Sequence, residues 1–314
     1  MSAAPGAAAA AEIVRLAMAD RRVYDAMARR ENEVWSSLLG QRERSAARAE
    51  DQAAAQVLRL GRNLLRFPAW MRGSGRRFGD CLSVGCGEGR LERQLMATGL
   101  CERFLGLDVA EGALADARAA AAAEGLAIEY RTADINFAEL AEATFDLIVA
   151  QTSLHHVLHL EHVADQILRA LRPGGVLWIH DYIGESQFQY SDTRLKIVNR
   201  LVAGLPPAFR HDRVHERKLG PLVRRAPGTL VSPFESIRSA DIPDVFLTRF
   251  EALERRETTT LLHLLVPVGT RAAFAATEEG RAVFETLFTL DELMARYGVL
   301  TPVTGQYILT PRRD

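Results

Sequence analysis

Three glycines and one carboxylate have the types and spacing of a nucleotide-binding site. Gly85, Gly87 and Gly89 follow a short apolar run, and Asp108 lies nineteen residues beyond the last of them. Glycine lets the backbone turn tightly and come close to a ligand, where any side chain would intrude. A carboxylate at about this distance, at the end of the second strand of a strand–helix–strand unit, binds ribose hydroxyls. The spacing predicts a site for an adenosine-type cofactor; the alternative is an ordinary tight turn between strand and helix.

The third glycine distinguishes between adenosine cofactors. A dinucleotide loop reads G-x-G-x-x-G, but its last position is Arg90 here, and the third glycine comes one residue early. The order G-x-G-x-G after Leu82-Ser83-Val84 resembles the nucleotide loop of class I S-adenosylmethionine (SAM) methyltransferases. The turn Leu171-Arg172-Pro173-Gly174-Gly175 resembles the L-[KR]-P-G-G segment that these enzymes often carry before the fifth strand. By this resemblance the chain is identified as a member of that family.

The resemblance implies that the cofactor is SAM, that S-adenosyl-L-homocysteine is the product, and that particular residues bind the cofactor. Asp108 would hold the ribose, the glycine loop the methionine portion and Asp134 the adenine amino group. A helix N-cap is the alternative role for Asp134. The expected cofactor-binding residues are Gly85, Cys86, Gly87, Gly89, Asp108, Val109, Asp134, Ile135 and Gln151. Many members carry an acid that helps hold the methionine amino group where this chain has Ser83, so that contact would pass to backbone carbonyls or water.

Two adjacent imidazoles, His155 and His156, follow the fourth expected strand. Because SAM carries an activated methyl group, the protein has mainly to align the acceptor and exclude water. An acceptor hydroxyl also needs a base, and imidazole titrates near neutral pH. We expect one of the two histidines to be that base, with packing or helix capping as the alternative for both. Tyr182, after the fifth strand, is the third expected catalytic residue.

Further histidines raise the question of a metal site. His159 and His162 continue the cluster at spacings that would place them with His155 on one face of a helix. Three imidazoles could bind zinc, but no cysteine or paired acid completes the set. The sequence therefore predicts no metal.

Residues after the fifth strand are candidates for binding the acceptor. The segment 184–190 resembles a G-x-S-x-F-Q-[WY] segment of a bacterial subset of these methyltransferases, several of them encoded with glycan or secondary-metabolite pathways. It would place Tyr182, Phe188 and Tyr190 at the rim of the acceptor cavity, where aromatic faces suit sugars or flat rings. The alternative is that these rings pack the following helix. Residues 232–239 resemble the subset's D-P-x-E-x-[IV]-x-S, with Ser232 replacing the Asp, and they contribute Arg238 as a third expected substrate-binding residue.

The elements that position these residues follow from periodicity. Continuous apolar strands alternate with helices between residues 80 and 182, which predicts an α/β fold with a parallel sheet covered on both faces. The resemblance implies a Rossmann-like sheet of seven strands, the last antiparallel, with N-terminal helices and a helical lid. The expected strands are 80–84, 103–107, 127–131, 145–150, 175–180, 250–258 and 305–311. In such a sheet ligands bind beyond the carboxyl ends of the strands, where the candidate residues lie.

The chain divides into five expected segments. They are a disordered tail (1–11), an N-terminal helical cap (12–72), a SAM-binding core (73–182), an acceptor-site lid (183–249) and a C-terminal part (250–314) of the same domain. Within the cap a second helix is expected from Arg42 to Leu65, closed by Pro68. The cap would pack on the flank of the sheet or fold over the cofactor mouth. Helices over 261–275 and 279–297 would continue the lid or form the face of a homodimer.

Composition limits the classes of partner. The 39 basic and 40 acidic residues nearly cancel, which argues against nucleic acid or a membrane surface as partner. Three cysteines beside the cofactor unit do not form a disulfide framework, so a cytoplasmic location is expected. We therefore predict a SAM-dependent methyltransferase that methylates an oxygen of a small molecule. N- or C-methylation, an RNA acceptor and a SAM-binding module without transfer are the alternatives.

Overall fold

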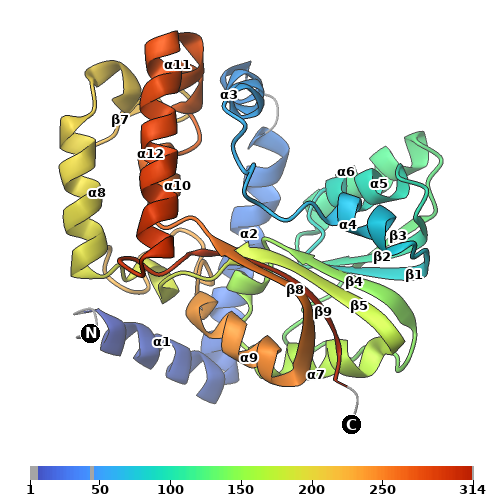
Figure 1. Ribbon diagram of the computed structural model, residues 1–314. Helices are drawn as coiled ribbons and strands as arrows, with labels where there is room; N and C mark the ends of the chain where they lie inside the picture. The colour runs from blue at the N-terminus through green and yellow to red at the C-terminus, as the bar shows by residue number, and fades with distance from the viewer. Residues whose placement is uncertain (1–5, 43–45, 313–314) are drawn as a thin grey trace.

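A seven-stranded sheet runs through the protein in the order β3-β2-β1-β4-β5-β9-β8 (Figure 1). The structure, a computed structural model, describes residues 6–42 and 46–312. The strands are β1 (Phe78–Val84), β2 (Cys101–Asp108), β3 (Ile128–Thr132), β4 (Phe145–Gln151), β5 (Leu171–Tyr182), β8 (Phe250–Thr258) and β9 (Thr304–Pro311). All seven strands were expected from the sequence, and each lies within a few residues of its expected position.

The topology places the candidate residues at one edge of the sheet. Strands β1 to β5 pair in parallel, whereas β9 is antiparallel to both of its neighbours, β5 and β8. The expected Rossmann-like sheet with an antiparallel last strand is thus confirmed. The strand order reverses between β1 and β4, which is where an α/β sheet binds its ligands.

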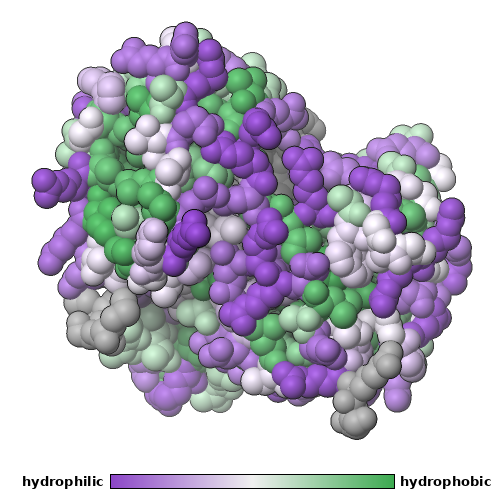
Figure 2. Space-filling view, in the orientation of Figure 1, coloured by the Kyte–Doolittle hydropathy of each residue, from purple (hydrophilic) through white to green (hydrophobic). Residues whose placement is uncertain are grey.

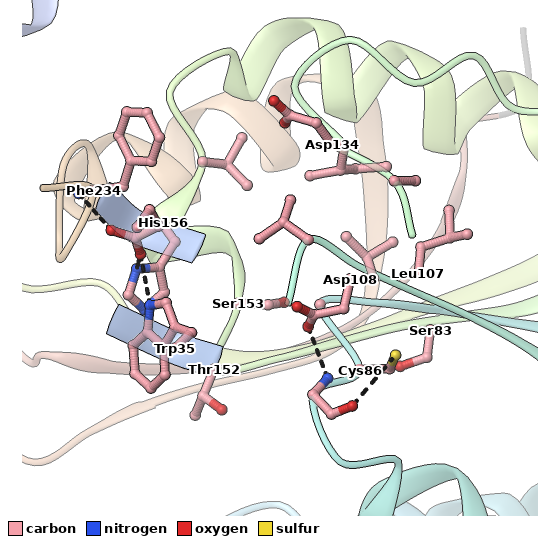
Figure 3. A pocket seen from close by; sticks show the side chains of 18 of the residues that line it. Trp35, Ser83, Cys86, Leu107, Asp108, Asp134, Thr152, Ser153, His156 and Phe234 are labelled. Atoms are coloured by element: carbon pink, nitrogen blue, oxygen red, sulfur yellow. Dashed lines mark hydrogen bonds and ion pairs between the residues drawn. The ribbon is translucent and has the colours of Figure 1, made fainter. Parts of the chain in front are cut away.

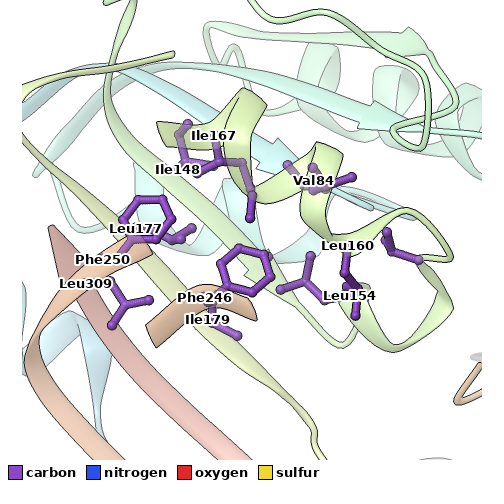
Figure 4. Packing of buried hydrophobic residues seen from close by; sticks show 14 of the residues in the cluster. Val84, Ile148, Leu154, Leu160, Ile167, Leu177, Ile179, Phe246, Phe250 and Leu309 are labelled. Carbon is purple, nitrogen blue, oxygen red and sulfur yellow. The ribbon is translucent and has the colours of Figure 1, made fainter. Parts of the chain in front are cut away.

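Helices cover both faces of the sheet. On one face α7 (Leu160–Ala170) and α9 (Ile242–Arg249) pack on aliphatic strand residues, as Ile167 and Phe246 do against Ile148 and Ile179 in Figure 4. The buried positions of α7 recur every three or four residues, as an amphipathic helix requires. On the other face lie α4 (Phe67–Ser74) and α5 (Arg90–Met96). There the ring of Phe67 stacks on that of Trp178 with centroids 4.4 Å apart. The helix α6 (Glu111–Ala123) connects β2 to β3.

The N-terminal helices differ in part from expectation. They are α1 (Ala7–Ala19), α2 (Arg21–Arg42) and α3 (Ala46–Val57), followed by α4. The expectation of a disordered tail over 1–11 is wrong from Ala7 onward, because α1 begins there and buries Ala10; residues 1–5 lie outside the described residues. The expected helix from Arg42 to Leu65 is in fact α3, which ends at Val57. Pro68 does not close a helix but lies in the first turn of α4, where a missing backbone N–H costs nothing.

A helical lobe stands beside the sheet in Figure 1. It consists of α3 together with α8 (Asp192–Gly204), α10 (Leu262–Leu265), α11 (Arg271–Ala276) and α12 (Glu278–Arg296), and it has an apolar core of its own. The helix expected over 261–275 is broken into α10 and α11. Pro267 and Gly269, the latter with a φ of +96°, lie between the two pieces and account for the break. A short hairpin of β6 (His211–Asp212) and β7 (Arg217–Lys218) was not expected, because two-residue strands leave no periodic pattern.

Polar side chains cover much of the surface seen in Figure 2, which also shows apolar patches over the helical lobe and a hollow between this lobe and the helices α5 and α6. Within the described residues, no helix combines the length and the apolar character needed to cross a membrane. The three cysteines are free.

Candidate active site

A cavity of about 600 Å³ opens at the carboxyl ends of β1, β2 and β4. Figure 3 shows Trp35, His156 and Phe234 at one end of it and Asp108 and Cys86 at the other. Of the nine expected cofactor-binding residues, eight line this cavity, namely Gly85, Cys86, Gly87, Asp108, Val109, Asp134, Ile135 and Gln151. The exception is Gly89. The tertiary structure therefore brings together residues that the sequence separates by more than sixty positions.

The glycine loop has the backbone that its sequence predicts. Gly85, Gly87 and Gly89 have φ angles of +68°, +52° and +68°, in the left-handed region that favours glycine. A Cβ atom on Gly89 would lie 2.1 Å from the hydroxyl of Tyr130 in β3. The third glycine thus serves the packing of α5 against the sheet, whereas the first two line the cavity.

Asp108 ties the end of β2 to the glycine loop. Its Oδ2 accepts a hydrogen bond from the backbone N–H of Gly87 at 2.8 Å, and its Oδ1 accepts one from Ala110 at 2.9 Å. Each carboxylate oxygen can accept a second hydrogen bond. The side chain therefore retains acceptor capacity for a ligand hydroxyl.

The helix α2 closes over the cavity, which is one of the two positions expected for the N-terminal cap. Tyr24, Ala28, Glu31 and Trp35 line the cavity, at spacings of four, three and four that put them on one face of the helix. The hydroxyl of Tyr24 donates to Oδ2 of Asp134 at 2.7 Å. The backbone N–H of Asn136 donates to the other oxygen of Asp134, and no helix begins there, so Asp134 does not act as a helix N-cap.

The two histidines are each oriented by a buried carboxylate. Nδ1 of His155 lies 2.5 Å from Oδ1 of Asp181 at the end of β5, and Nδ1 of His156 lies 2.9 Å from Oε1 of Glu31. Both Nε2 atoms face the carboxylate of Glu235, at 3.6 Å from His155 and 3.7 Å from His156. Three distant segments of the chain therefore converge on this pair of imidazoles.

Electrostatics define the protonation of His155. Burial alone would lower the pKa of His155, but the attraction of Asp181 and the hydrogen bond to it raise that pKa above its usual value, with a smaller contribution from Glu235. Burial would likewise raise the pKa of Asp181, yet His155 and the backbone N–H groups of Leu154 and Ser153 hold it below its usual value. Asp181 is thus ionised and keeps a proton on Nδ1 of His155, which leaves Nε2 facing the cavity.

The expected row of histidines on one helix face does not exist. His155 lies in a 3₁₀ turn (Leu154–His156), His159 precedes α7, and Nε2 of His162 is 3.1 Å from the carbonyl oxygen of Ala138. Among the described residues, the group with the spacing to hold a metal ion is His155, His156 and Glu235, whose ligand atoms lie within 4.8 Å of one another. The absence of a metal stays a prediction.

The expected acceptor residues lie elsewhere. Tyr182, Phe188 and Tyr190 are not among the residues that line the cavity. Their rings pack on one another, with centroids 5.4 and 5.9 Å apart, and Tyr182 also packs on His263 of α10. Burial of their apolar faces accounts for this position. The contacts agree with the alternative named above, in which these rings serve packing and do not bind the acceptor.

Arg238 also lies outside the cavity lining. Its guanidinium binds both carboxylate oxygens of Glu161 at 2.6 and 2.7 Å and also pairs with Asp241. Its donors are thus used to hold the segment before α9 against α7. The expectation that Arg238 contacts a substrate is not supported by this position.

Several lining residues were not expected from the sequence. They are Tyr24, Glu31, Trp35, Glu92, Phe234 and Glu235. The regular spacing along α2 was a usable signal for three of them. Glu235 is the acid of the D-P-x-E-x-[IV]-x-S segment, so the sequence offered a signal for it as well. Glu92 and Phe234 carried no pattern that separates them from other residues.

Comparison with known proteins shows similarity over the central part of the chain. Residues 82–179 match the family model described as a methyltransferase domain. The match shows that this part of the chain is similar to methyltransferase domains. This part contains the glycine loop, Asp108 and both histidines of the cavity.

The chain is similar to several curated methyltransferases. It is 38% identical over 114 residues to the malonyl-(acyl-carrier protein) O-methyltransferase of Enterobacter lignolyticus. The aligned residues make up 36% of this chain and 41% of that protein. It is 33% identical over 97 residues to a ubiquinone biosynthesis O-methyltransferase of a Methylobacterium species, covering 31% of this chain and 38% of the relative. It is 34% identical over 110 residues to the 27-O-demethylrifamycin SV methyltransferase of Amycolatopsis mediterranei, covering 34% and 40%. The similarity thus spans about two fifths of the length of each relative.

Proposed function

We propose that this protein is a SAM-dependent methyltransferase that methylates an oxygen atom of a small-molecule acceptor. The observation that carries the proposal is that the glycine loop, Asp108 and His155 line the same cavity. The imidazole of His155 is held there by the carboxylate of Asp181. The methyltransferase domain match and the O-methyltransferases among the similar proteins support it. The resemblance of residues 184–190 to a bacterial subset supports a natural product or glycan-type metabolite as acceptor.

In this proposal the chain binds and orients the reactants and accepts one proton. SAM, when bound, supplies a methyl group on a sulfonium that needs no further activation. Asp108 would accept hydrogen bonds from the ribose, Asp134 would hold the adenine, and α2 would exclude water from the cavity. Residues 183–249 would contribute the acceptor side through Phe234 and Glu235, which line the cavity.

His155 is the proposed general base. Its Nδ1 proton is held by Asp181, so that Nε2 can accept the proton of an acceptor hydroxyl as the new O–C bond forms. Glu235, 3.6 Å from Nε2, would stabilise the imidazolium. His156 would fix α2 over the site through Glu31 and pack edge-on against Trp35, at 5.2 Å between ring centroids.

Two experiments test the proposal. Isothermal titration calorimetry should show binding of SAM and S-adenosylhomocysteine and no binding of NAD, and the opposite preference would overturn the cofactor assignment. Incubation of the protein with methyl-¹³C SAM and a metabolite extract should then give a labelled product by mass spectrometry. The variant His155→Gln should bind SAM normally and lose this product. An unchanged yield in variants of both histidines would instead favour transfer to nitrogen or carbon.

A further inference from the structure

One buried carboxylate in the cavity has no ion-pair partner among the described residues. Glu92 lies in the first turn of α5 and lines the cavity together with Ser83 and Asp108. Its exposed fraction is 0%, and neither side-chain oxygen has a hydrogen bond of ordinary geometry or an ion pair within the part of the chain that the structure describes, although the hydroxyl of Ser83 lies close enough to lower the pKa of Glu92 in part. A buried polar group without a partner costs free energy, and folded proteins leave few of them. A ligand in the cavity that Glu92 lines can supply such a partner.

The charges around Glu92 define what that ligand group must be. Arg93, the adjacent cation, is turned to the carboxylate of Glu124 at 3.1 Å and to the carbonyl oxygen of Glu88 at 2.7 Å. Asp108 lies close enough to disfavour the charged form of Glu92. The corner therefore holds two carboxylates, and Arg93, the neighbouring cation, gives its hydrogen bonds to Glu124 and Glu88 instead. Of the two cationic groups of SAM, the sulfonium has no N–H, whereas the α-ammonium has three.

The position of Ser83 supports the same conclusion. In the family that this chain resembles, an acid at this position helps to hold the methionine amino group, and here the position is a buried serine at the end of β1. Glu92 adjoins Ser83 in the cavity lining and brings a carboxylate to the same corner from the neighbouring helix. We propose that Glu92 binds the α-ammonium group of SAM and so takes over the contact that Ser83 cannot make. This inference rests on the proposed function, in which SAM is the cofactor.

The protonation of Glu92 agrees with such a role. Burial raises the pKa of Glu92 to about 7, and the neighbouring Ser83 offsets this only in part. An ammonium group at hydrogen-bond distance would favour the carboxylate and lower that pKa again. Binding of SAM to the protonated form would then release a proton, so that the affinity for SAM rises with pH up to about 7.

Calorimetry with two ligands tests the contact. SAM carries the ammonium group, whereas 5′-methylthioadenosine has the adenosine and the sulfur but lacks the amino acid. The variant Glu92→Gln should bind SAM about tenfold to a hundredfold more weakly, the range for a hydrogen bond to a charged group. It should bind methylthioadenosine within about twofold of the wild-type protein. As a control, Asp108→Asn should weaken both ligands, because both contain the ribose.

A second variant restores the acid where the family carries it. The double variant Ser83→Asp with Glu92→Gln should recover most of the lost affinity for SAM and leave methylthioadenosine unchanged. Glu92→Gln is expected to fold, because a neutral residue at this position removes a buried charge. If Glu92→Gln does not fold, Glu92→Asp, which shortens the side chain by one methylene, replaces it in the same experiment. Glu92→Asp should weaken SAM but not methylthioadenosine.

The pH dependence gives a readout on the unmodified protein. Between pH 5.5 and 7.5 the affinity of the wild-type protein for SAM should rise, and that for methylthioadenosine should not. The titratable groups that face Glu92 are Cys86, Arg93, Asp108 and Tyr130. Burial raises the pKa of the Cys86 thiol and of the Tyr130 hydroxyl, so neither loses a proton in this range.

Three results would overturn the inference. They are an unchanged SAM affinity in Glu92→Gln, an equal loss for both ligands, and a flat pH profile for SAM in the wild-type protein. If the wild-type protein binds neither ligand, the proposed function fails and the inference fails with it. If the wild-type protein binds SAM and Glu92→Gln does so equally well, the inference alone fails.

Discussion

Replacing Asp181 by Asn changes the charge beside His155 while keeping the shape of the side chain. Asp181 is fully buried and accepts four contacts. Oδ2 accepts from the backbone N–H groups of Ser153 at 3.0 Å and Leu154 at 2.7 Å, and Oδ1 accepts from Tyr182 at 2.7 Å and faces His155 at 2.5 Å. In Asp181→Asn the amide oxygen can accept hydrogen bonds from the backbone N–H groups of Ser153 and Leu154 only. The amide NH₂ then faces two donors, and Nδ1 of His155 has to give up its proton.

The expected size of the effect follows from these contacts. Loss of an adjacent opposite charge lowers the pKa of a histidine by about one to three pH units, or ~1.4 to 4 kcal/mol. Because burial already disfavours the charged imidazole, the pKa of His155 should fall from above its usual value to below it. The neutral ring should also change tautomer, from a proton on Nδ1 to one on Nε2. The unmet backbone donor of Tyr182 should lower the free energy of unfolding by about 1–3 kcal/mol.

Histidine-selective ¹⁵N NMR measures both quantities without an acceptor. Titration from pH 4.5 to 9 should show a lowered midpoint for His155 in Asp181→Asn, and the ring ¹⁵N shifts should report the other tautomer. His263 provides an internal control, because burial and the positive charge of Arg194 lower its pKa to about 3, so its signals should not titrate in either protein. An unchanged midpoint and tautomer for His155, in a variant that is folded by circular dichroism, would refute the proposed pairing.

Three further outcomes are expected. Tyr24→Phe removes the hydroxyl that donates to Asp134, so urea denaturation should give a free energy of unfolding lower by about 0.5–1.5 kcal/mol; an unchanged value would mean that this contact is absent in solution. Arg194→Met removes a fully buried guanidinium that pairs with Glu185 at 2.9 Å, and should cost about 3–5 kcal/mol in the same assay, whereas a loss below about 1 kcal/mol would argue against the buried pair. Dialysis against EDTA should leave SAM binding and methyl transfer unchanged, and recovery of lost activity on adding zinc would contradict the prediction of no metal.

The strands of the sheet could be predicted from the sequence because the signal for each strand lies in residues that are adjacent in the chain. Strands of a parallel sheet are buried on both faces, so they appear as continuous apolar runs such as Leu147–Ala150, in which every residue is fully buried. The glycine loop is equally local, since a left-handed φ at Gly85 and Gly87 restricts those positions to few residue types. For these reasons eight of nine cofactor-binding predictions fell on the cavity.

The acceptor side was harder to predict, because aromatic residues serve packing as readily as binding. Tyr182 and Tyr190 are residues of a type that binds flat ligands, yet both pack their rings against Phe188. Tyr182 also packs against His263. Arg238 has the charge to bind an anion, yet two carboxylates of the protein already occupy its donors. Residue type alone does not separate these uses.

What the sequence by itself determined is the order and extent of the strands, the turn at the glycine loop and the carboxylate at the end of β2, since each depends on residues close together in the chain. What only the tertiary structure decided is which distant side chains share the cavity. Glu31 of α2, Asp181 of β5 and Glu235 all reach the two histidines, and Glu92 turns inward beside Ser83. These contacts depend on how α2 and the segment before α9 pack across the sheet. That packing is set by the summed burial of many side chains, which no short motif records.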